Sequence, residues 1–184
     1  DDKLTLAHLG DSRIYLYRNR KLFPVTKDHS LVQSLVDRKK IKASKAANHE
    51  QKHIITKALG PRAAATAEVS DFIKLYNGDR LLLCTDGLTG EVSEREIRTI
   101  LKKNNIEKAA QILVDTANAN GGKDNITIQL IEISGCSNLP LGYVDKNPVH
   151  KPRKYENIFI WFLYITTILL VFVLGYFSYN FFFR

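Results

Sequence analysis

The sequence predicts an α+β fold in which antiparallel strands come first and helices are inserted before a last strand. Three observations predict it. The N-terminal part contains short apolar runs joined by tight turns, which is typical of an antiparallel meander. Two consecutive helical patterns follow in the second half, the first opened by a capping signal. A strictly alternating apolar run then closes the domain.

The first strands are expected at Leu4–Leu9 and Arg13–Arg18, joined by a turn at Gly10-Asp11. A second turn near Asn19-Arg20 leads to a strand at Leu22–Val25. From residue 30 to about residue 52 the pattern changes. The apolar residues there have helical spacing, and a polar stretch rich in Lys and Ala follows them.

Two further strands are expected at Ala67–Leu75 and Leu81–Cys84, separated by a turn. Ser93 and Glu96 form the sequence pattern of a capping box, in which each side chain bonds the other residue's backbone N–H, so a helix should begin there. A second helix is expected over about Ile106–Asn118, and the run up to Ile133 alternates like a half-buried strand.

The C-terminal part has a different composition. Residues 135–156 are rich in proline and predict a linker, and the segment Ile158–Tyr179 contains no charged residue over about 22 positions. As a helix it would reach about 33 Å at about 1.5 Å per residue, enough to cross a hydrocarbon core of about 30 Å. A transmembrane helix over 157–180 with a tail at 181–184 is therefore expected. The alternative is a buried core helix.

Basic residues precede this segment, whereas only Arg184 follows it, which predicts a single-pass membrane protein with a cytoplasmic N-terminal domain. The formal net charge of +8 would then partly face membrane lipid. The basic residues are scattered and not interleaved with aromatic ones, so no nucleic-acid partner is expected. Cys84 and Cys136 lie in unrelated contexts and do not indicate a disulfide framework.

Three aspartates, Asp11, Asp86 and Asp124, each lie in a short loop next to a strand-like run. Strands fix where their ends point, so these carboxylates can converge although they are far apart in the sequence. Carboxylate oxygens suit hard cations such as Mg²⁺ and Mn²⁺. The chemistry that this predicts is metal-assisted hydrolysis or phosphoryl transfer. For Asp86 the alternative is an ordinary turn residue, and for Asp11 it is a turn acid paired with nearby Arg13.

Five motifs occur in an order that resembles a known family. They are Gly10-Asp11-Ser12-Arg13, Thr26-Lys27-Asp28-His29-Ser30, Ile55-Thr56-Lys57-Ala58-Leu59-Gly60, Asp86-Gly87-Leu88 and Lys123-Asp124-Asn125-Ile126-Thr127. Together they resemble the second half of a metal-dependent serine/threonine phosphatase of the protein phosphatase type 2C family, in its bacterial form. The resemblance implies that residues 1–134 are the C-terminal part of such a domain, with a flap at about 30–54.

The resemblance also implies an antiparallel two-sheet sandwich flanked by helices, in α-β-β-α layers. It implies that Asp86 and Asp124 hold a catalytic pair of Mn²⁺ or Mg²⁺ ions, and that Asp11 holds a third, weaker ion together with Asp86. No further catalytic side chain is expected. The residues expected to support these ligands are Gly87, Asn125, Ser12 and Thr85. For His29, a loop or packing role and a catalytic role both stay open.

The predicted function is the hydrolysis of phosphoserine and phosphothreonine in proteins, by an enzyme that opposes a serine/threonine kinase. In the family, the first half supplies a further acidic ligand, an Asp-Gly-x-Gly-Gly stretch and a phosphate-binding arginine, and none of these occurs here. The chain is thus expected to be a fragment, weak or inactive without that half. The alternative is a noncatalytic module, a pseudophosphatase that binds phosphoproteins at the membrane.

Overall fold

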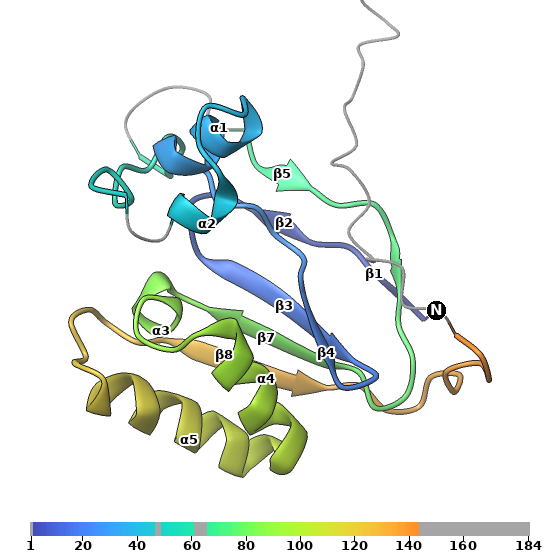
Figure 1. The fold of residues 1–184 in the computed structure, drawn as a ribbon. Helices are drawn as coiled ribbons and strands as arrows, with labels where there is room; N and C mark the ends of the chain where they lie inside the picture. The colour runs from blue at the N-terminus through green and yellow to red at the C-terminus, as the bar shows by residue number, and fades with distance from the viewer. Residues whose placement is uncertain (1, 47–48, 61–65, 144–184) are drawn as a thin grey trace, which may run out of the picture. The chain divides into compact units, whose positions relative to one another are not determined.

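The computed structural model describes residues 2–46, 49–60 and 66–143 (Figure 1). These residues belong to the first of two compact units of the chain, Asp1–Pro152. The second unit, Arg153–Arg184, lies outside the described residues. The described part is α+β with antiparallel strand pairs, as the sequence predicts.

A four-stranded sheet lies at the centre, with the strand order β4-β3-β7-β8 and antiparallel pairing throughout. Its strands are β3 (Arg13–Arg18), β4 (Lys21–Pro24), β7 (Arg80–Cys84) and β8 (Ile128–Glu132). Asn19 and Arg20 both have positive φ, 48° and 60°, at the turn between β3 and β4. Left-handed backbone at two successive turn residues matches the twist of an antiparallel hairpin, so this turn fixes the register of the pair.

Four short strands form two further antiparallel pairs, which are β1 (Lys3–Leu4) with β6 (Ile73–Lys74) and β2 (Ala7–His8) with β5 (Glu68–Val69). The continuous strands expected at 4–9 and 67–75 are thus each interrupted. The Leu6 N–H donates to the Ser70 hydroxyl at 3.0 Å, and the Ser70 N–H donates to the Leu6 carbonyl at 2.9 Å. A side-chain acceptor replaces a backbone acceptor at this point, which ends the regular ladder.

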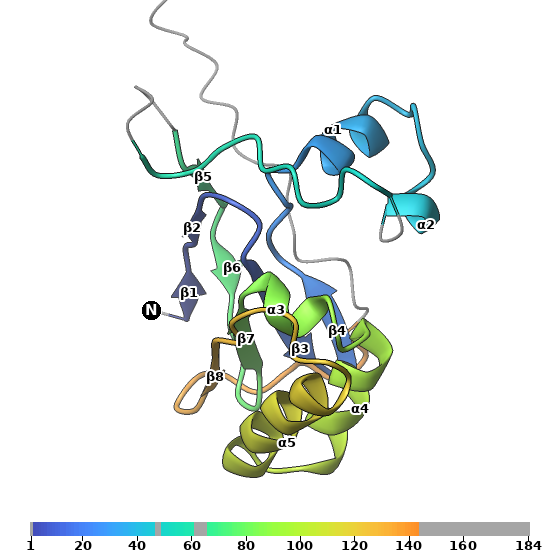
Figure 2. The ribbon, with the colours of Figure 1, turned by 90° about the vertical axis from the view of Figure 1, so that its left-hand side faces the viewer.

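The longer helices and the short strand pairs lie on opposite faces of the central sheet (Figures 1 and 2). Alternating side chains of this sheet pack into two separate cores. Tyr15 and Leu82 face α4 (Glu94–Lys103) and α5 (Ile106–Ala119), while Leu16 packs with residues of β1 and β6 on the opposite face. The described residues therefore build a helix layer, the central sheet and the smaller strand pairs, three of the four predicted layers.

Helix α4 begins where the sequence predicts a cap. At α4 the Ser93 hydroxyl accepts from the Glu96 N–H at 3.3 Å, and the Glu96 carboxylate accepts from the Ser93 N–H at 3.0 Å, which confirms the capping box. Ser30 caps α1 (Leu31–Asp37) in a similar way by accepting from Gln33 N. The remaining helices are α2 (Ala43–Ala46), in the predicted flap, and α3 (Asp86–Thr89), which follows β7.

The predicted membrane localisation is corrected by the helices of the structure. No helix within the described residues is long and apolar enough to cross a membrane. The longest of them, α5, has 14 residues and reaches about 21 Å at about 1.5 Å per residue, against a hydrocarbon core of about 30 Å. A single-pass localisation is therefore no longer proposed. The segments predicted as a transmembrane helix (157–180) and a tail (181–184) lie outside the described residues.

The first residues of the predicted linker 135–156 are hydrogen-bonded to the domain, while residues 144–156 lie outside the described part of the chain. The Asn77 N–H donates to the Ser137 carbonyl at 3.0 Å, and the Cys136 N–H donates to the Asn77 side-chain oxygen at 3.0 Å. The Ser137 hydroxyl donates to Asp2 at 3.2 Å. The described residues after β8 thus lie along the end of the sheet.

Candidate metal centre

Asp86 is held at the start of the short helix α3. Strand β7 ends at Cys84, Thr85 is the extended residue before the helix, and Asp86 is its exposed first residue. Leu88, two residues later, is completely buried among the side chains that pack between the sheet and the helices. The buried Leu88 anchors the helix from inside, so the loop that carries Asp86 is fixed while its carboxylate faces outward.

The loop that carries Asp124 lies directly against this helix start. The Thr85 hydroxyl donates to the Asn125 carbonyl at 3.1 Å and accepts from the Thr127 N–H at 3.1 Å. The backbone of Asn125 lies so close to Gly87 that a Cβ at this position would be 2.4 Å from the Asn125 carbonyl oxygen, so only glycine fits here. The two loops are therefore in direct contact. The predicted supporting residues Thr85, Gly87 and Asn125 make this contact.

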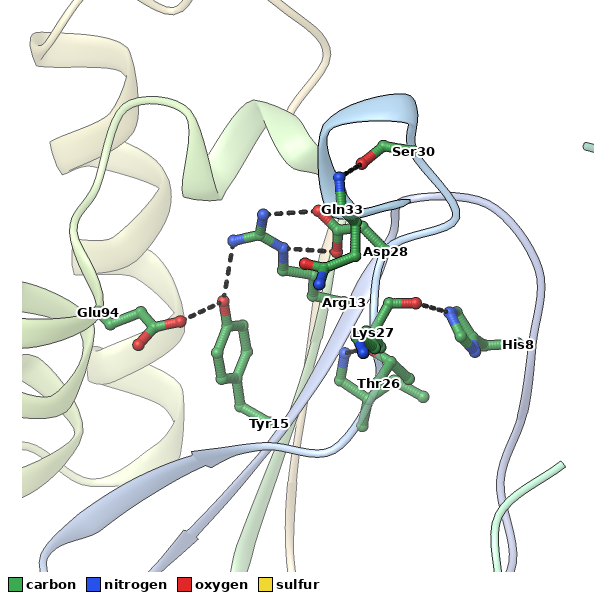
Figure 3. A network of polar contacts seen from close by, with 10 residues as sticks. His8, Arg13, Tyr15, Thr26, Lys27, Asp28, Ser30, Gln33 and Glu94 are labelled. Atoms are coloured by element: carbon green, nitrogen blue, oxygen red, sulfur yellow. Dashed lines mark hydrogen bonds and ion pairs between the residues drawn. The ribbon is translucent and has the colours of Figure 1, made fainter. Parts of the chain in front are cut away.

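Asp11, the third predicted ligand, lies in the loop between β2 and β3. Burial raises the pKa of its carboxyl above the usual value, and the negative charge of Asp86 raises it further. The two carboxylates are thus near enough to repel each other. A backbone hydrogen bond and the positive charge of Arg13 lower this pKa in the opposite direction, and Arg13 itself forms a bidentate pair with Asp28 at 2.7 and 2.9 Å (Figure 3). Ser12, the fourth predicted supporting residue, is exposed beside Asp11.

The three aspartates are neighbours without forming a closed cluster. Within the part of the chain that the structure describes, none of them forms a salt bridge. They are also not a group of three whose ligand atoms all lie within 4.8 Å of one another, a condition that His8, His29 and Glu68 meet. The Asp124 carboxylate accepts from the Asn125 N–H at 2.7 Å, which orients it within its own loop.

The sequence and the fold are similar to those of known enzymes, although no family model matches the chain. A serine/threonine phosphatase, stp, of Listeria welshimeri is 42% identical over 132 residues, which are 71% of this chain and 52% of that protein. The solved serine/threonine phosphatase of S. agalactiae is 36% identical with a TM-score of 0.68, over 73% of this chain and 55% of that one. The chain is a relative of the PPM-type serine/threonine phosphatases.

A third comparison bears on the metal. The catalytic domain of the serine/threonine phosphatase PstP, solved in complex with two manganese ions, is 34% identical with a TM-score of 0.62. That match covers 71% of this chain and 53% of that one. The relatives and structural neighbours are serine/threonine protein phosphatases of the PPM family, and the chain spans about half the length of the curated relatives it matches.

In this PPM relative, residues 26–30 run beside the Asp11 loop and bond to it repeatedly (Figure 3). We call residues 26–30 the strap. The Thr26 hydroxyl accepts from the Ile14 N–H at 2.9 Å, and Asp28 holds Arg13. Arg13 also reaches the Tyr15 hydroxyl at 3.4 Å, and that hydroxyl donates to Glu94 of α4 at 3.2 Å. A polar chain therefore connects the strap to the helix layer.

The cluster of His8, His29 and Glu68 was missed from the sequence. His8 and Glu68 are direct partners in the β2–β5 pair, and the rings of His8 and His29 are stacked with centroids 4.4 Å apart. His29 Nε2 lies 3.0 Å from the Glu68 carboxylate, and His8 Nε2 lies 2.9 Å from the Lys27 carbonyl. The only sequence signal was His29 within its motif, because neither short strand could be paired in advance.

Because His8 is packed against His29, we expect the folded protein to lose stability in acid. Burial lowers the pKa of His8 below its usual value of 6.5, and nearby His29 lowers it further, against the opposing effects of the Lys27 carbonyl, Glu68 and Asp28. The unfolded chain therefore binds more protons than the folded one as the pH falls through 6.5. The contribution of the neutral His8 to the free energy of unfolding is complete above pH 6.5 and is lost as the pH falls below it.

We expect the free energy of unfolding, measured with urea at several pH values between about 8 and 5, to fall toward acid in the wild type. His8→Asn should reduce that slope, because the variant has no imidazole to protonate there. His53→Ala, at an exposed histidine, is the matched control and should keep the wild-type slope. Equal slopes in all three proteins would contradict the prediction.

Proposed function

We propose that this chain carries metal-ligating loops of a phosphatase that hydrolyses phosphoserine and phosphothreonine in proteins. Asp86, Asp124 and Asp11 are the residues that would hold Mn²⁺ or Mg²⁺. The main support is the contact between two loops, in which Thr85 and Gly87 bring the Asp86 loop against the backbone of Asn125. That contact joins residues about 40 positions apart at the ends of neighbouring strands β7 and β8.

The donor chemistry fits a hard cation. All three side chains are carboxylates, which are the ligands that Mg²⁺ and Mn²⁺ prefer. The charge of Asp86 raises the pKa of Asp11, and Arg13, which is paired with Asp28, offsets this only in part. Within the described residues, none of the three aspartates forms a salt bridge. Neighbouring carboxylates are stabilised when a divalent cation binds between them.

When bound, such ions lower the pKa of a water molecule and offset the negative charge of a phosphoryl group. Other residues of the chain hold these ligands in position. Thr85 fixes the Asp124 loop by its hydroxyl, Leu88 anchors the Asp86 helix in the core, and Asp28 binds Arg13, two residues after Asp11. Phosphorylated proteins as substrates, and an opposing serine/threonine kinase as a partner, are part of the same proposal.

The proposal predicts that Asp86→Asn impairs metal binding by the full 184-residue chain. Asp86 is the residue common to the proposed catalytic pair and the third ion, and the amide keeps its shape while removing the charge. We expect Mn²⁺ affinity to fall by more than about tenfold. The measurement is the paramagnetic broadening of backbone amide signals in the three loops as Mn²⁺ is added to the labelled protein.

Asp115→Asn is the matched control, because it makes the same charge change at an exposed residue of α5 that is not among the proposed ligands. It should leave the Mn²⁺ titration unchanged. If the wild type and both variants broadened at the same Mn²⁺ concentrations, the proposed metal centre would be wrong. Cleavage of a phosphothreonine peptide, dependent on Mn²⁺ and lost in Asp86→Asn, would establish the reaction itself.

A further inference from the structure

We propose that His29 is a positioning residue that ties the Asp11 loop to the segment following the predicted flap, with Glu68 as its anchor. The inference deepens the proposed function and rests on it, because it assigns His29 a task for the loop that presents Asp11 to metal. It concerns a buried side chain, 8% exposed, whose polar atoms all point at neighbouring segments.

His29 bonds to Gly10 twice, once through the backbone and once through its ring. The His29 N–H donates to the Gly10 carbonyl at 2.9 Å, and the Gly10 N–H donates to His29 Nδ1 at 3.1 Å. Gly10 has a φ of 105°, a backbone conformation that disfavours other residues and gives the loop its sharp turn. The ring of His29 thus satisfies the donor of the residue immediately before Asp11.

The same histidine is held from the opposite side by segments beyond the predicted flap at 30–54. Its carbonyl accepts from the Thr56 N–H at 2.7 Å, and its Nε2 lies 3.0 Å from the Glu68 carboxylate. The next residues continue this attachment, since the Leu31 N–H donates to the Ile54 carbonyl at 2.8 Å. Both ends of the predicted flap therefore meet at His29.

The hydrogen bonds fix the form of the ring. Nδ1 accepts a hydrogen bond from the Gly10 N–H, so the neutral ring carries its proton on Nε2, and this N–H donates to Glu68. This arrangement argues against a metal ion bound by His8, His29 and Glu68, although their ligand atoms lie close together. A metal on Nε2 would require the proton on Nδ1, where it would face the Gly10 N–H. A positioning role uses every bond as it stands.

Asp11 is consequently held on both sides by the strap. His29 fixes Gly10 before it, and Asp28 fixes Arg13 after it through two hydrogen bonds (Figure 3). Because Gly10 and Arg13 are both held, the Asp11 carboxylate keeps its position although the negative charge of Asp86 repels it. Losing the His29 bond should allow the loop to relax away and should weaken metal binding that involves Asp11.

The test compares His29→Ala, which removes both ring contacts, with His29→Asn, whose side-chain oxygen can still accept from the Gly10 N–H. In the metal-free 184-residue chain, we expect the Gly10 amide to exchange with solvent about tenfold faster in His29→Ala than in the wild type. His29→Asn should restore most of the protection, and Mn²⁺ broadening of the Asp11 loop should follow the same order. Long-range ¹H–¹⁵N spectra should show the proton of the wild-type ring on Nε2.

His53→Ala serves as the control and should change neither readout. Because His29→Asn keeps one bond, it reports on the proposal even if His29→Ala fails to fold. Unchanged Gly10 exchange in the folded variants, or a ring proton on Nδ1, would overturn the positioning role. So would normal Mn²⁺ binding by a variant with a fast Gly10 amide. If instead the wild type bound no Mn²⁺ while Gly10 behaved as expected, the proposed function would fail and the attachment of the loop would stand.

Discussion

Gly87→Ala should destabilise the domain by about 2 kcal/mol and weaken Mn²⁺ binding together with it. The added Cβ would lie 2.4 Å from the carbonyl oxygen of Asn125 and 3.0 Å from its carbonyl carbon. Both are backbone atoms, which cannot move aside as the end of a flexible side chain can. Alanine is a better helix former than glycine by about 1 kcal/mol, and Gly87 lies in α3, so this gain opposes the clash without cancelling it.

Two measurements check this result, the free energy of unfolding in urea and the Mn²⁺ concentration at which the loop amides broaden. Gly60→Ala is the matched control, since a Cβ there meets nothing within 4 Å. Gly60→Ala should leave the free energy of unfolding within about 0.5 kcal/mol of the wild type and should not change the Mn²⁺ concentration at which the amides broaden. A Gly87→Ala protein as stable as Gly60→Ala would show that the two loops do not need their close approach, which would remove the main support for the metal centre.

The parts of the fold that could be predicted from the sequence are those determined by neighbouring residues. The capping box at Ser93 involves atoms three residues apart, and strands β3 and β7 are indicated by their apolar residues and flanking turns. The interruption at Ser70 could not be predicted, because it depends on a hydrogen bond to Leu6, 64 residues away. Such a contact exists only after the strands have paired.

The candidate site divides in the same way. The loops of Asp11, Asp86 and Asp124 are expected to converge because strands fix where their ends point. In the structure the Asp86 loop contacts the Asp124 loop, and the charge of Asp86 raises the pKa of Asp11. The attachment of the Asp11 loop to His29 and Glu68 was not predicted. It depends on the register of β2 against β5, and both strands are two residues long, too short to show a pattern.

Asp79→Asn should cost about 3 to 5 kcal/mol of stability, because it leaves the charge of Arg18 buried without a partner. The two side chains are 4% and 2% exposed and form two hydrogen bonds of 2.8 and 2.6 Å. Arg18 additionally donates to the Lys74 carbonyl at 2.6 Å and to the Tyr143 hydroxyl at 3.2 Å. The pair therefore joins β3 to β6 and to the residues after β8, so its loss affects several elements at once.

Asp37→Asn is the control for this prediction, because Asp37 forms a salt bridge of 2.6 Å with Lys27 on the surface. Their side chains are 42% and 54% exposed, so water screens the pair and its loss should cost less than about 1 kcal/mol. The substitution, the lost charge and the contact distance are matched, and burial is what differs. If urea unfolding gave equal costs for the two variants, burial would not be what makes the Arg18–Asp79 pair important. The asparagine at position 79 can still accept from the Tyr76 N–H, so that hydrogen bond does not account for the expected loss.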